Sequence, residues 1–559
     1  MRIPGLDRRS IVAVLSGGVA ATIAAPALTH QAAVQPAAPH LVVVVVADQF
    51  RSDYMDWYGS RWTKGLRRIY DKGAVFTENA YPYAATLTCA GHATIGTGTF
   101  PATHGMSGND FYDRALRRLV PCAFDSDAVS VPFGGEPGTE HHSPRSLLVP
   151  TFADELRRQA KVPPRIVSLG QKPRTAITLA GRPGPETVVA WEEDAGVWAT
   201  STTYSKTAWP DVDEFVRARP MKNDYGKVWT LLMPPNAYRF VDDGAGEATP
   251  GPWTRVFPHP LISRTGKPDN EFVTAWEESP WNDAFLTDLA IHLLRSRRLG
   301  TGTGTDYLAV SFPSLDHAGH EFGPRSHEVQ DNLYRIDINL GRLLDAIEAQ
   351  VGSAYVLGLS SDHGVAIVPE QVVAEAGDAG RISTTALRAA INGAITQTMG
   401  QAMGTVTQFV ASIYEEQVAL TPGVYDRLRA KPGALRAVRD AIASVRGVAA
   451  VYTADEIVEG SGSDPAIRPW QLSYVPGRSG DFAITPKANW IIRSTSGTTH
   501  GSLNSYDQRV PLVLFGQGIR PGRYAGRTTP ADMVVTFATL TGIQMPRAQG
   551  RALTEALVR

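Results

Sequence analysis

The stretch LVVVVVADQF, residues 41–50, is an almost unbroken run of aliphatic, mostly β-branched residues that stops at a carboxylate, Asp48. A run of this kind, without polar alternation, is typical of a parallel strand that is buried on both faces of a sheet. Ligands of open α/β sheets bind at the carboxyl ends of the strands. The stretch therefore predicts a central parallel strand and, at Asp48, the edge of the sheet where a functional site lies.

The same pattern recurs along the chain. Further strands are predicted at RIVSLG (165–170), DYLAVSF (306–312), YVLGLS (355–360) and VPLVLFG (510–516). Segments with apolar residues three and four apart, which is the spacing of helices, alternate with them at 149–160, 281–298, 327–350 and 531–542. This alternation predicts an α/β fold with a doubly wound, mostly parallel sheet flanked by helices.

Residues 40–559 are expected to form one main domain with two large insertions, at about 176–280 and 369–490. Both intervals are far longer than ordinary connections, so each must have structure of its own. The first contains ETVVAWEEDAGVWATSTTY (186–204), which predicts a hairpin around Asp-Ala-Gly, and the second contains helical segments. We expect both α+β insertions to lie over the carboxyl edge of the sheet, where they would shape a substrate entrance.

The N-terminus has the features of a signal peptide. Arg2, Arg8 and Arg9 precede the apolar stretch 11–25, which is short and rich in small residues. We expect a signal peptide at 1–27 and a linker at 28–39, so that the mature protein is periplasmic or secreted and has no membrane span. The Arg pair leaves both the Sec and the twin-arginine routes open.

Composition excludes some partners and leaves the cysteines undecided. The 559 residues carry a formal net charge of −1, with 43% hydrophobic and 19% charged residues, which is typical of a globular enzyme and gives no indication of nucleic-acid binding. We expect a monomer. Only Cys89 and Cys122 are present, and they could form one disulfide in an oxidising compartment or remain two free thiols.

Acids and histidines at the predicted strand ends suggest metal binding. The candidates are Asp48, Asp316, His320, Asp362, His363 and His500, each beside a predicted strand or in a Gly-containing turn. A mixed set of carboxylates and imidazoles suits borderline divalent metals such as zinc. The number of candidates is enough for two ions, an arrangement that clamps the attacking and leaving oxygens in phosphoryl transfer.

Several motifs in order along the chain extend this pattern. They are VVVADQFRSDY, TLTCAGHATIGTG, FPATHGMSGND, SLGQKPR, DHAGHEFGP, SSDHG and THGSLNSYDQRVPLVLFG. Together they resemble the alkaline phosphatase superfamily, and within it the phosphate-irrepressible alkaline phosphatases that use a threonine nucleophile. The resemblance runs from about Asp48 to Gly518, and the second insertion matches it much less clearly.

The resemblance implies an alkaline phosphatase-like fold, two zinc ions (Zn²⁺) and a phosphothreonine intermediate on Thr88. It assigns Asp48, Asp362, His363 and the Thr88 oxygen to one zinc, Asp316, His320 and His500 to the other, and Asn109, Lys172 and Arg174 to the phosphoryl oxygens. It also makes His92 a supporting residue rather than a ligand. The implied activity is hydrolysis of phosphate esters with an alkaline optimum, because protons that compete for the ligands are lost as the pH rises.

Charge favours small-molecule phosphate monoesters as substrates. Two zinc ions, three carboxylates and a Thr88 alkoxide would roughly cancel, which leaves the positive charges of Lys172 and Arg174. A monoester carries about two negative charges near neutral pH, whereas a diester carries one fewer. The Lys-x-Arg pair therefore matches a monoester.

Other activities remain open from the sequence. A phosphodiesterase or nucleotide pyrophosphatase of the same superfamily would share the six metal ligands without needing Lys172 and Arg174. A non-enzymatic exported metal-binding protein would explain the Asp and His residues, but not Thr88 or Asn109. A sulfatase is disfavoured, because the residues after Cys89 lack the Pro and Arg of a C-x-P-x-R motif.

Overall fold

The central strand predicted from LVVVVVADQF is β1 (Leu41–Ala47), and every residue of it is buried. The computed structural model describes residues 38–184, 186–404, 406 and 408–558. The predicted signal peptide and nearly all of the linker therefore lie outside the described residues. β1 pairs in parallel with β11 (Asp306–Phe312) on one side and with β12 (Tyr355–Ser360) on the other.

The main sheet, within the described residues, has ten strands in the order β20, β2, β19, β12, β1, β11, β6, β7, β8, β5. The strands not yet named are β2 (Ala74–Asn79), β5 (Ser130–Phe133), β6 (Ile166–Gly170), β7 (Thr187–Glu192), β8 (Val197–Ser201), β19 (Leu512–Gly516) and β20 (Gly522–Thr528). The strands from β12 across to β7 are parallel, whereas β19 runs antiparallel to both β12 and β2. The predicted mostly parallel sheet is confirmed.

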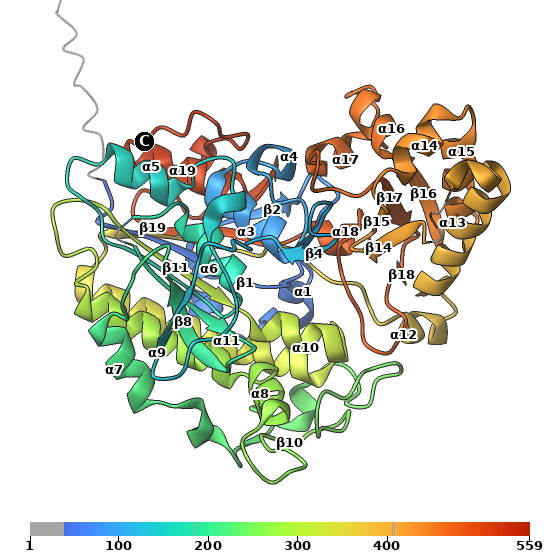
Figure 1. Cartoon of the computed structure of the whole chain (residues 1–559). Helices are drawn as coiled ribbons and strands as arrows, with labels where there is room; N and C mark the ends of the chain where they lie inside the picture. Colours follow the sequence, from blue (N-terminus) through green and yellow to red (C-terminus); the bar gives the residue numbers. More distant parts are fainter. Residues whose placement is uncertain (1–37, 185, 405, 407, 559) are drawn as a thin grey trace, which may run out of the picture. The chain divides into compact units, whose positions relative to one another are not determined.

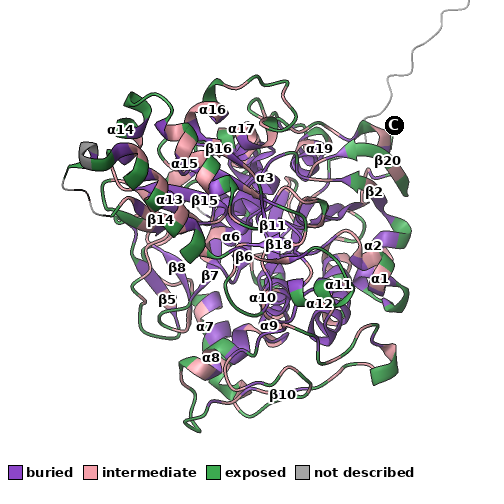
Figure 2. Ribbon diagram, turned by 90° about the vertical axis from the view of Figure 1, so that its right-hand side faces the viewer, coloured by how far each residue is buried: buried purple, intermediate pink, exposed green. Residues whose placement is uncertain are grey.

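Alternate residues of β1 pack into two different cores. Leu41, Val43 and Val45 belong to the core that includes α2 (Gly65–Lys72), α9 (Trp281–Ser296) and α11 (His327–Val351). Val42 and its alternate neighbours pack against α3 (Thr88–Thr97), α5 (Phe152–Gln159), α6 (Pro173–Ala180) and α19 (Asp532–Thr541). Figure 1 shows α5 and α19 on one side of the strands and α9 and α11 on the other, and Figure 2 shows the strands buried between them. Both faces are covered, as a doubly wound fold requires.

The first insertion begins within the main sheet. The predicted hairpin is confirmed, because β7 and β8 pair antiparallel from Ala190–Ala199 to Glu192–Val197, and together with β5 they extend the sheet beyond β6. The remaining elements of this interval are α7 (Pro210–Ala218), β9 (Val228–Trp229), β10 (His259–Pro260) and α8 (Asn270–Glu277). Part of the insertion therefore widens the sheet.

The second insertion has a small sheet and a core of its own. Its four-stranded sheet has the order β14, β15, β17, β16, and its core includes Leu387, Val418 and Ile484. Its elements are α12 (Pro369–Ala374), β13 (Gly380–Arg381), α13 (Thr384–Met399), β14 (Val410–Tyr414), β15 (Gln417–Leu420), α14 (Val424–Ala430), α15 (Ala434–Ala443), β16 (Val448–Thr453), α16 (Ala454–Glu459), α17 (Arg468–Ser473), β17 (Phe482–Pro486) and β18 (Trp490–Ile491). These elements form the orange lobe in Figure 1.

Short elements complete the fold near the carboxyl edge of the main sheet. They are α1 (Tyr54–Tyr58), α4 (Pro101–His104), β3 (Asp110–Asp113), β4 (Arg118–Pro121), α10 (Ser314–Phe322) and α18 (Ser505–Gln508). Among the described residues, no helix combines the length and the apolar character that crossing a membrane requires.

Candidate functional site

Three strands deliver acidic side chains to one edge of the main sheet. Asp48 directly follows β1, Asp316 lies in the first turn of α10 after β11, and Asp362 follows β12. All three carboxylates are almost completely buried. Because β1, β11 and β12 are parallel, their carboxyl ends meet, and sequence-distant acids come together there.

His500 reaches the same edge by a different route. It lies on the segment that enters β19, and β19 runs antiparallel to β12. The amino end of β19 therefore lies at the carboxyl edge of the parallel strands. This explains how a residue that precedes its strand can join residues that follow theirs.

Two sets of buried side chains lie close enough to hold a metal ion. The ligand atoms of Asp48, Asp362 and His363 all lie within 4.8 Å of one another, and so do those of Asp316, His363 and His500. The first set contains three of the ligands that the resemblance assigns to one zinc. The second has His363 where the resemblance has His320, whose Nε2 lies 3.3 Å from Asp316 Oδ1. All six of the predicted Asp and His ligands thus converge on one region.

The three histidines are oriented as metal ligands. Each Nδ1 lies against a backbone carbonyl oxygen: His320 against Thr498 at 3.1 Å, His363 against Gly364 at 3.0 Å and His500 against Thr86 at 2.9 Å. A carbonyl oxygen can only accept, so each Nδ1 donates, and in the neutral imidazole each Nε2 then has a lone pair on the side of the carboxylates. This is the tautomer in which imidazole binds a metal through Nε2.

The carboxylates also fit a metal site. Among the described residues, Asp48 Oδ1 and Asp362 Oδ2 are buried without a hydrogen-bond partner. Buried carboxylate oxygens of this kind are costly unless a cation compensates them. Burial, together with repulsion from Asp316 and Asp362, raises the pKa of Asp48 to about 7. A divalent cation would relieve this repulsion and give the unpartnered oxygens of Asp48 and Asp362 a positive partner.

Lys172 is the cation that the chain itself places among these acids. Its Nζ donates to Asp48 Oδ2 at 2.8 Å and also to Asp316 Oδ2. Although burial alone would raise the pKa of Asp316, Lys172 holds it well below its usual range. Lys172 is the N-cap of α6, so Arg174 lies in the first turn of that helix; its buried Nε has no hydrogen-bond partner among the described residues.

Thr88 is the first residue of α3, where the chain changes from extended backbone at Leu87 to helix. Its Oγ1 lies 3.4 Å from His363 Nε2. The small residues of α3 allow this close approach, because a β-carbon at Gly91 would lie 2.3 Å from the Asp362 carbonyl oxygen. Thr88 therefore presents its hydroxyl directly to the ligand cluster.

Asn109 is held beside the start of α3. The Cys89 N–H donates to Asn109 Oδ1 at 2.8 Å, so the side-chain amide must be oriented with Nδ2 as its free donor. Cys89 and Cys122 form a disulfide, which decides between the two states that the sequence left open. The Cys122 N–H donates to the Asn109 carbonyl oxygen at 2.8 Å, so the disulfide and this hydrogen bond together link Asn109 to the start of α3.

Sequence reasoning missed some of the residues that support the site. Gln49, with a positive φ of 65°, donates its backbone N–H to Asp362 Oδ1 at 3.1 Å and its side-chain amide to Asp316 Oδ1 at 2.5 Å. Its position after Asp48 was the only available signal. His92, expected to support the site, has its Nδ1 2.9 Å from the Thr88 carbonyl oxygen and 3.2 Å from Asp362 Oδ2. Glu415, which contacts Asn109, lies in no motif that would mark it in the sequence.

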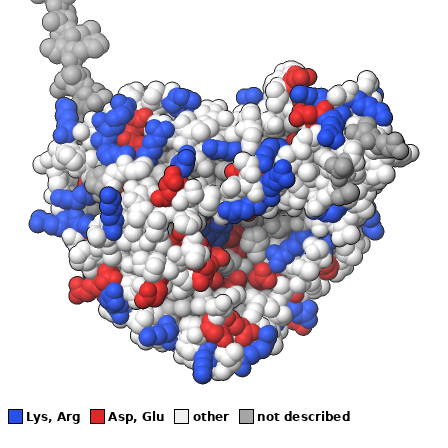
Figure 3. Space-filling view, in the orientation of Figure 1, with Lys and Arg blue, Asp and Glu red and all other residues white. Residues whose placement is uncertain are grey.

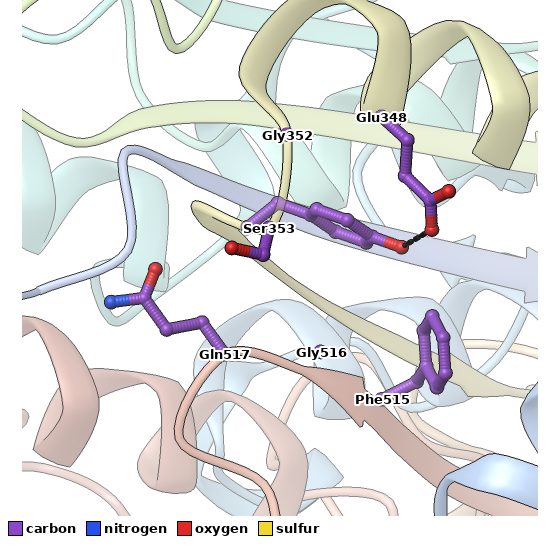
Figure 4. Close-up of a pocket in the computed structure, with 7 residues that line it drawn as sticks. Glu348, Gly352, Ser353, Phe515, Gly516 and Gln517 are labelled. Atoms are coloured by element: carbon purple, nitrogen blue, oxygen red, sulfur yellow. Dashed lines mark hydrogen bonds between the residues drawn. The ribbon is translucent and has the colours of Figure 1, made fainter.

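A cavity of about 410 Å³ opens beside Lys172 and Arg174, with Phe124 and His141 in its wall. Figure 3 shows that this face of the molecule is hollowed near its centre and that acidic and basic side chains gather around the hollow. A cavity of about 640 Å³, drawn in Figure 4, is lined by Tyr355 and Gly516 among others. Tyr355 begins β12, so that cavity lies at the opposite edge of the sheet from the acids and histidines.

Comparisons with known proteins match the chain over nearly its whole length. The model of the type I phosphodiesterase / nucleotide pyrophosphatase family matches residues 42–509. A protein of Myroides odoratus named calcium-transporting ATPase is 31% identical, over 93% of this chain and 95% of its own length. Alkaline phosphatase PhoV of Synechococcus elongatus is 29% identical, over 95% of this chain and 97% of its own.

A solved structure agrees at the level of the fold. The crystal structure of wild-type alkaline phosphatase PafA superposes with a TM-score of 0.83 at 27% identity, covering 93% of this chain and 99% of that one. A second solved structure is of PafA with a threonine, an asparagine, a lysine and an arginine substituted. These are the residue types of Thr88, Asn109, Lys172 and Arg174, in the same order along the chain.

Proposed function

The chain belongs to the type I phosphodiesterase / nucleotide pyrophosphatase family, within the alkaline phosphatase superfamily, and on that premise we propose that it hydrolyses phosphate monoesters through a phosphothreonine at Thr88. Relatives identify the enzyme as an alkaline phosphatase. The observation that carries the proposal is the position of Thr88 at the start of α3, with its hydroxyl against His363 in the ligand cluster that Lys172 also enters through Asp48.

Asn109, Lys172 and Arg174 would bind the nonbridging phosphoryl oxygens. The Asn109 amide is left with a free donor, and Arg174 has a planar fork suited to two oxygens. Lys172 would move from its contacts with Asp48 and Asp316 once metal ions neutralise those carboxylates. The substituted residue types in the PafA variant support this set.

Two zinc ions would be held by Asp48, Asp362, His363 and Thr88, and by Asp316, His320 and His500. When bound, such ions supply Lewis-acid stabilisation of the attacking and departing oxygens. The chain's own part is to fix the ligands: backbone carbonyls set the histidine tautomers, and Gln49 donates to the carboxylates of Asp362 and Asp316. The Oγ of Thr88 would form a bond to phosphorus as the ester oxygen departs, and water would later release phosphate and restore the hydroxyl.

The substrate proposed is a small monoester rather than a diester. Two cationic side chains at the phosphoryl position match the dianion of a monoester, and the adjoining cavity of about 410 Å³ would accept its organic part. The Myroides relative is named as an ATPase. An ATPase also hydrolyses a bond to phosphorus. From the name of this relative we therefore take only hydrolysis at phosphorus as relevant to this chain. We further propose export by the N-terminal segment, which agrees with the disulfide.

Trapping of the intermediate tests the nucleophile. Acid quenching of the enzyme during turnover of a labelled monoester should yield phosphothreonine at Thr88 in the wild type and phosphoserine in Thr88→Ser. Thr88→Ala should give no labelled protein and lose most turnover, because the attacking oxygen is absent. Thr539→Ala, on the exposed side of α19, is the matched control. Labelling that persists at another residue in Thr88→Ala would refute the proposed nucleophile.

Removal of metal tests the cofactor. Exhaustive chelation should abolish monoester hydrolysis and lower the melting temperature, because three buried carboxylates would be left with Lys172 as their main compensating charge. Addition of zinc should restore both properties, with about two ions per chain measured by elemental analysis. Full activity in protein shown to contain no metal would eliminate the two-zinc proposal.

A further inference from the structure

A tight turn of the second insertion has an unusual backbone. Glu415 and Glu416 join β14 to β15, with positive φ values of 46° and 60°. A two-residue turn of this kind normally takes Asn or Gly, because a β-carbon is strained in the left-handed region. Strained residues persist where surrounding contacts stabilise them, and they cluster at functional sites. The contacts of Glu415 and Glu416 therefore indicate what stabilises this strained turn and whether it belongs to the functional site.

Glu415 contacts the backbone of Asn109. Both of its carboxyl oxygens accept from the Asn109 N–H, each at 3.0 Å. The carboxyl occupies space that exists only because residue 108 is glycine, since a β-carbon at Gly108 would lie 2.2 Å from Glu415 Oε2. Glu415 thus fixes the peptide from which the Asn109 side chain projects.

Glu416 repeats the arrangement on the other side of the site. It is 4% exposed, and its Oε2 has no hydrogen-bond partner among the described residues. A β-carbon at Gly501, the residue after His500, would lie 2.5 Å from that oxygen. Two consecutive glutamates therefore lie against two glycines, each of which neighbours a residue of the site.

The environment of Glu415 also includes the phosphoryl-binding charges. Burial of its carboxyl, followed by repulsion from Asp110, raises the pKa of Glu415 to about 8, while Asn109 and Arg174 oppose this rise. Near neutral pH the carboxyl is therefore mainly protonated, and it then accepts from the Asn109 N–H through its carbonyl oxygen. A glutamine at this position would have the same shape and charge and could still accept from the Asn109 N–H.

We propose that Glu415 is a positioning residue for phosphoryl binding: it holds the Asn109 backbone so that the Asn109 amide faces the phosphoryl oxygens. This inference rests on the proposed function, because it assigns Asn109 that role. Through this turn, the second insertion takes part in the reaction as well as bordering the site. The strain of the turn is the consequence of bringing Glu415 to Asn109.

A double-mutant cycle with Asn109 tests the proposal at pH 7, with a phosphate monoester as substrate and inorganic phosphate as inhibitor. Glu415→Ala should lower kcat/KM about tenfold or more and weaken phosphate inhibition, since losing one preorganised donor costs roughly 10²–10³ in rate. Glu415→Gln should retain most of the kcat/KM and most of the inhibition by phosphate. In the Asn109→Ala background, Glu415→Ala should cause little further loss, because the group on which it acts is gone.

A variant that leaves Glu415 intact provides an independent check. Gly108→Ala should displace the Glu415 carboxyl and reproduce the kinetic defect, without adding to that of Glu415→Ala. Glu459→Ala, at the exposed end of α16, is the matched control and should behave as the wild type. The proposal would be overturned if Glu415→Ala lowered kcat/KM by the same factor in the wild-type and Asn109→Ala backgrounds. It would also be overturned if neither Glu415→Ala nor Gly108→Ala lowered kcat/KM. Absence of a phosphothreonine at Thr88 would instead count against the proposed function itself.

Discussion

At the scale of the residue, Lys172 compensates the charge of buried acids, and we propose that the same side chain binds substrate. Its Nζ lies between Asp48 and Asp316, two carboxylates that would otherwise repel each other. This contact strongly favours the charged form of Lys172, and its pKa is raised although the side chain is buried. A lysine that stays charged within the ligand cluster has the charge needed to bind a phosphoryl dianion, as proposed.

Removal of both cations should change the preference for monoesters. The Lys172→Ala/Arg174→Ala variant should lose at least about 100-fold in kcat/KM for a monoester, because charge-assisted hydrogen bonds to phosphoryl oxygens are among the strong ones. A diester has less negative charge and should lose much less. Parallel assays of the two ester classes at a fixed zinc concentration measure the ratio of kcat/KM for the monoester to kcat/KM for the diester. A larger loss for the diester would favour the phosphodiesterase alternative.

At the scale of the element, α3 depends on small residues. Its backbone approaches the end of β12 at Gly91 and the backbone of α6 at Gly96, where a β-carbon would lie 2.3 Å from the Thr178 carbonyl oxygen. No residue of α3 is exposed. The disulfide joins Cys89, at the start of α3, to Cys122, whose N–H donates to the Asn109 carbonyl oxygen, so the proposed nucleophile and the proposed phosphoryl ligand Asn109 have a shared support.

Loss of the disulfide should therefore affect both stability and activity. The two cysteines are 33 residues apart, a loop whose closure corresponds to roughly 3–4 kcal/mol of stability in the chain-entropy model. Urea denaturation of Cys89→Ala/Cys122→Ala should show a loss of about that size, with a reduced kcat/KM because Asn109 is held less firmly. Thiol titration of the unfolded wild type should detect free cysteines only after reduction. Unchanged stability in the double variant would contradict this account.

At the scale of the whole molecule, the fold buries many carboxylates, and some of them lie far from the metal ligands along the chain. Glu247, in the first insertion, is 4% exposed, and burial raises its pKa to about 8. Between the unfolded pKa, near 4.5, and the folded value, the native state holds a proton that the unfolded chain has released. Stability must then fall as the pH rises through that interval.

Glu247→Gln should remove this contribution. Because the amide cannot ionise, the melting temperature of the variant relative to the wild type should rise from pH 5 to pH 8 and then level off. Scanning calorimetry across this range measures the difference. Glu459→Gln, on the surface of α16, should show no such trend. A pH-independent difference for Glu247→Gln would mean that its carboxyl is not protonated in the folded protein.

The sequence by itself indicated five strands of the main sheet, among them LVVVVVADQF, the mostly parallel character of that sheet and the residue types available at the strand ends; the order of the strands came from the structure. Hydrophobic runs and polar strand ends are local properties, so they can be found without coordinates. The resemblance added the roles of Thr88, Asn109, Lys172 and Arg174. The state of Cys89 and Cys122 remained open, because pairing depends on a distance between segments 33 residues apart.

Only the tertiary structure decided which groups meet. The antiparallel direction of β19 places His500 with ligands that follow parallel strands, and backbone carbonyls from three separate segments fix the histidine tautomers. The contact of Glu415 with Asn109 joins residues 306 positions apart and has no periodic pattern or motif that could announce it. Local chemistry is encoded residue by residue, whereas the distances that make it a site depend on the packing of the entire chain.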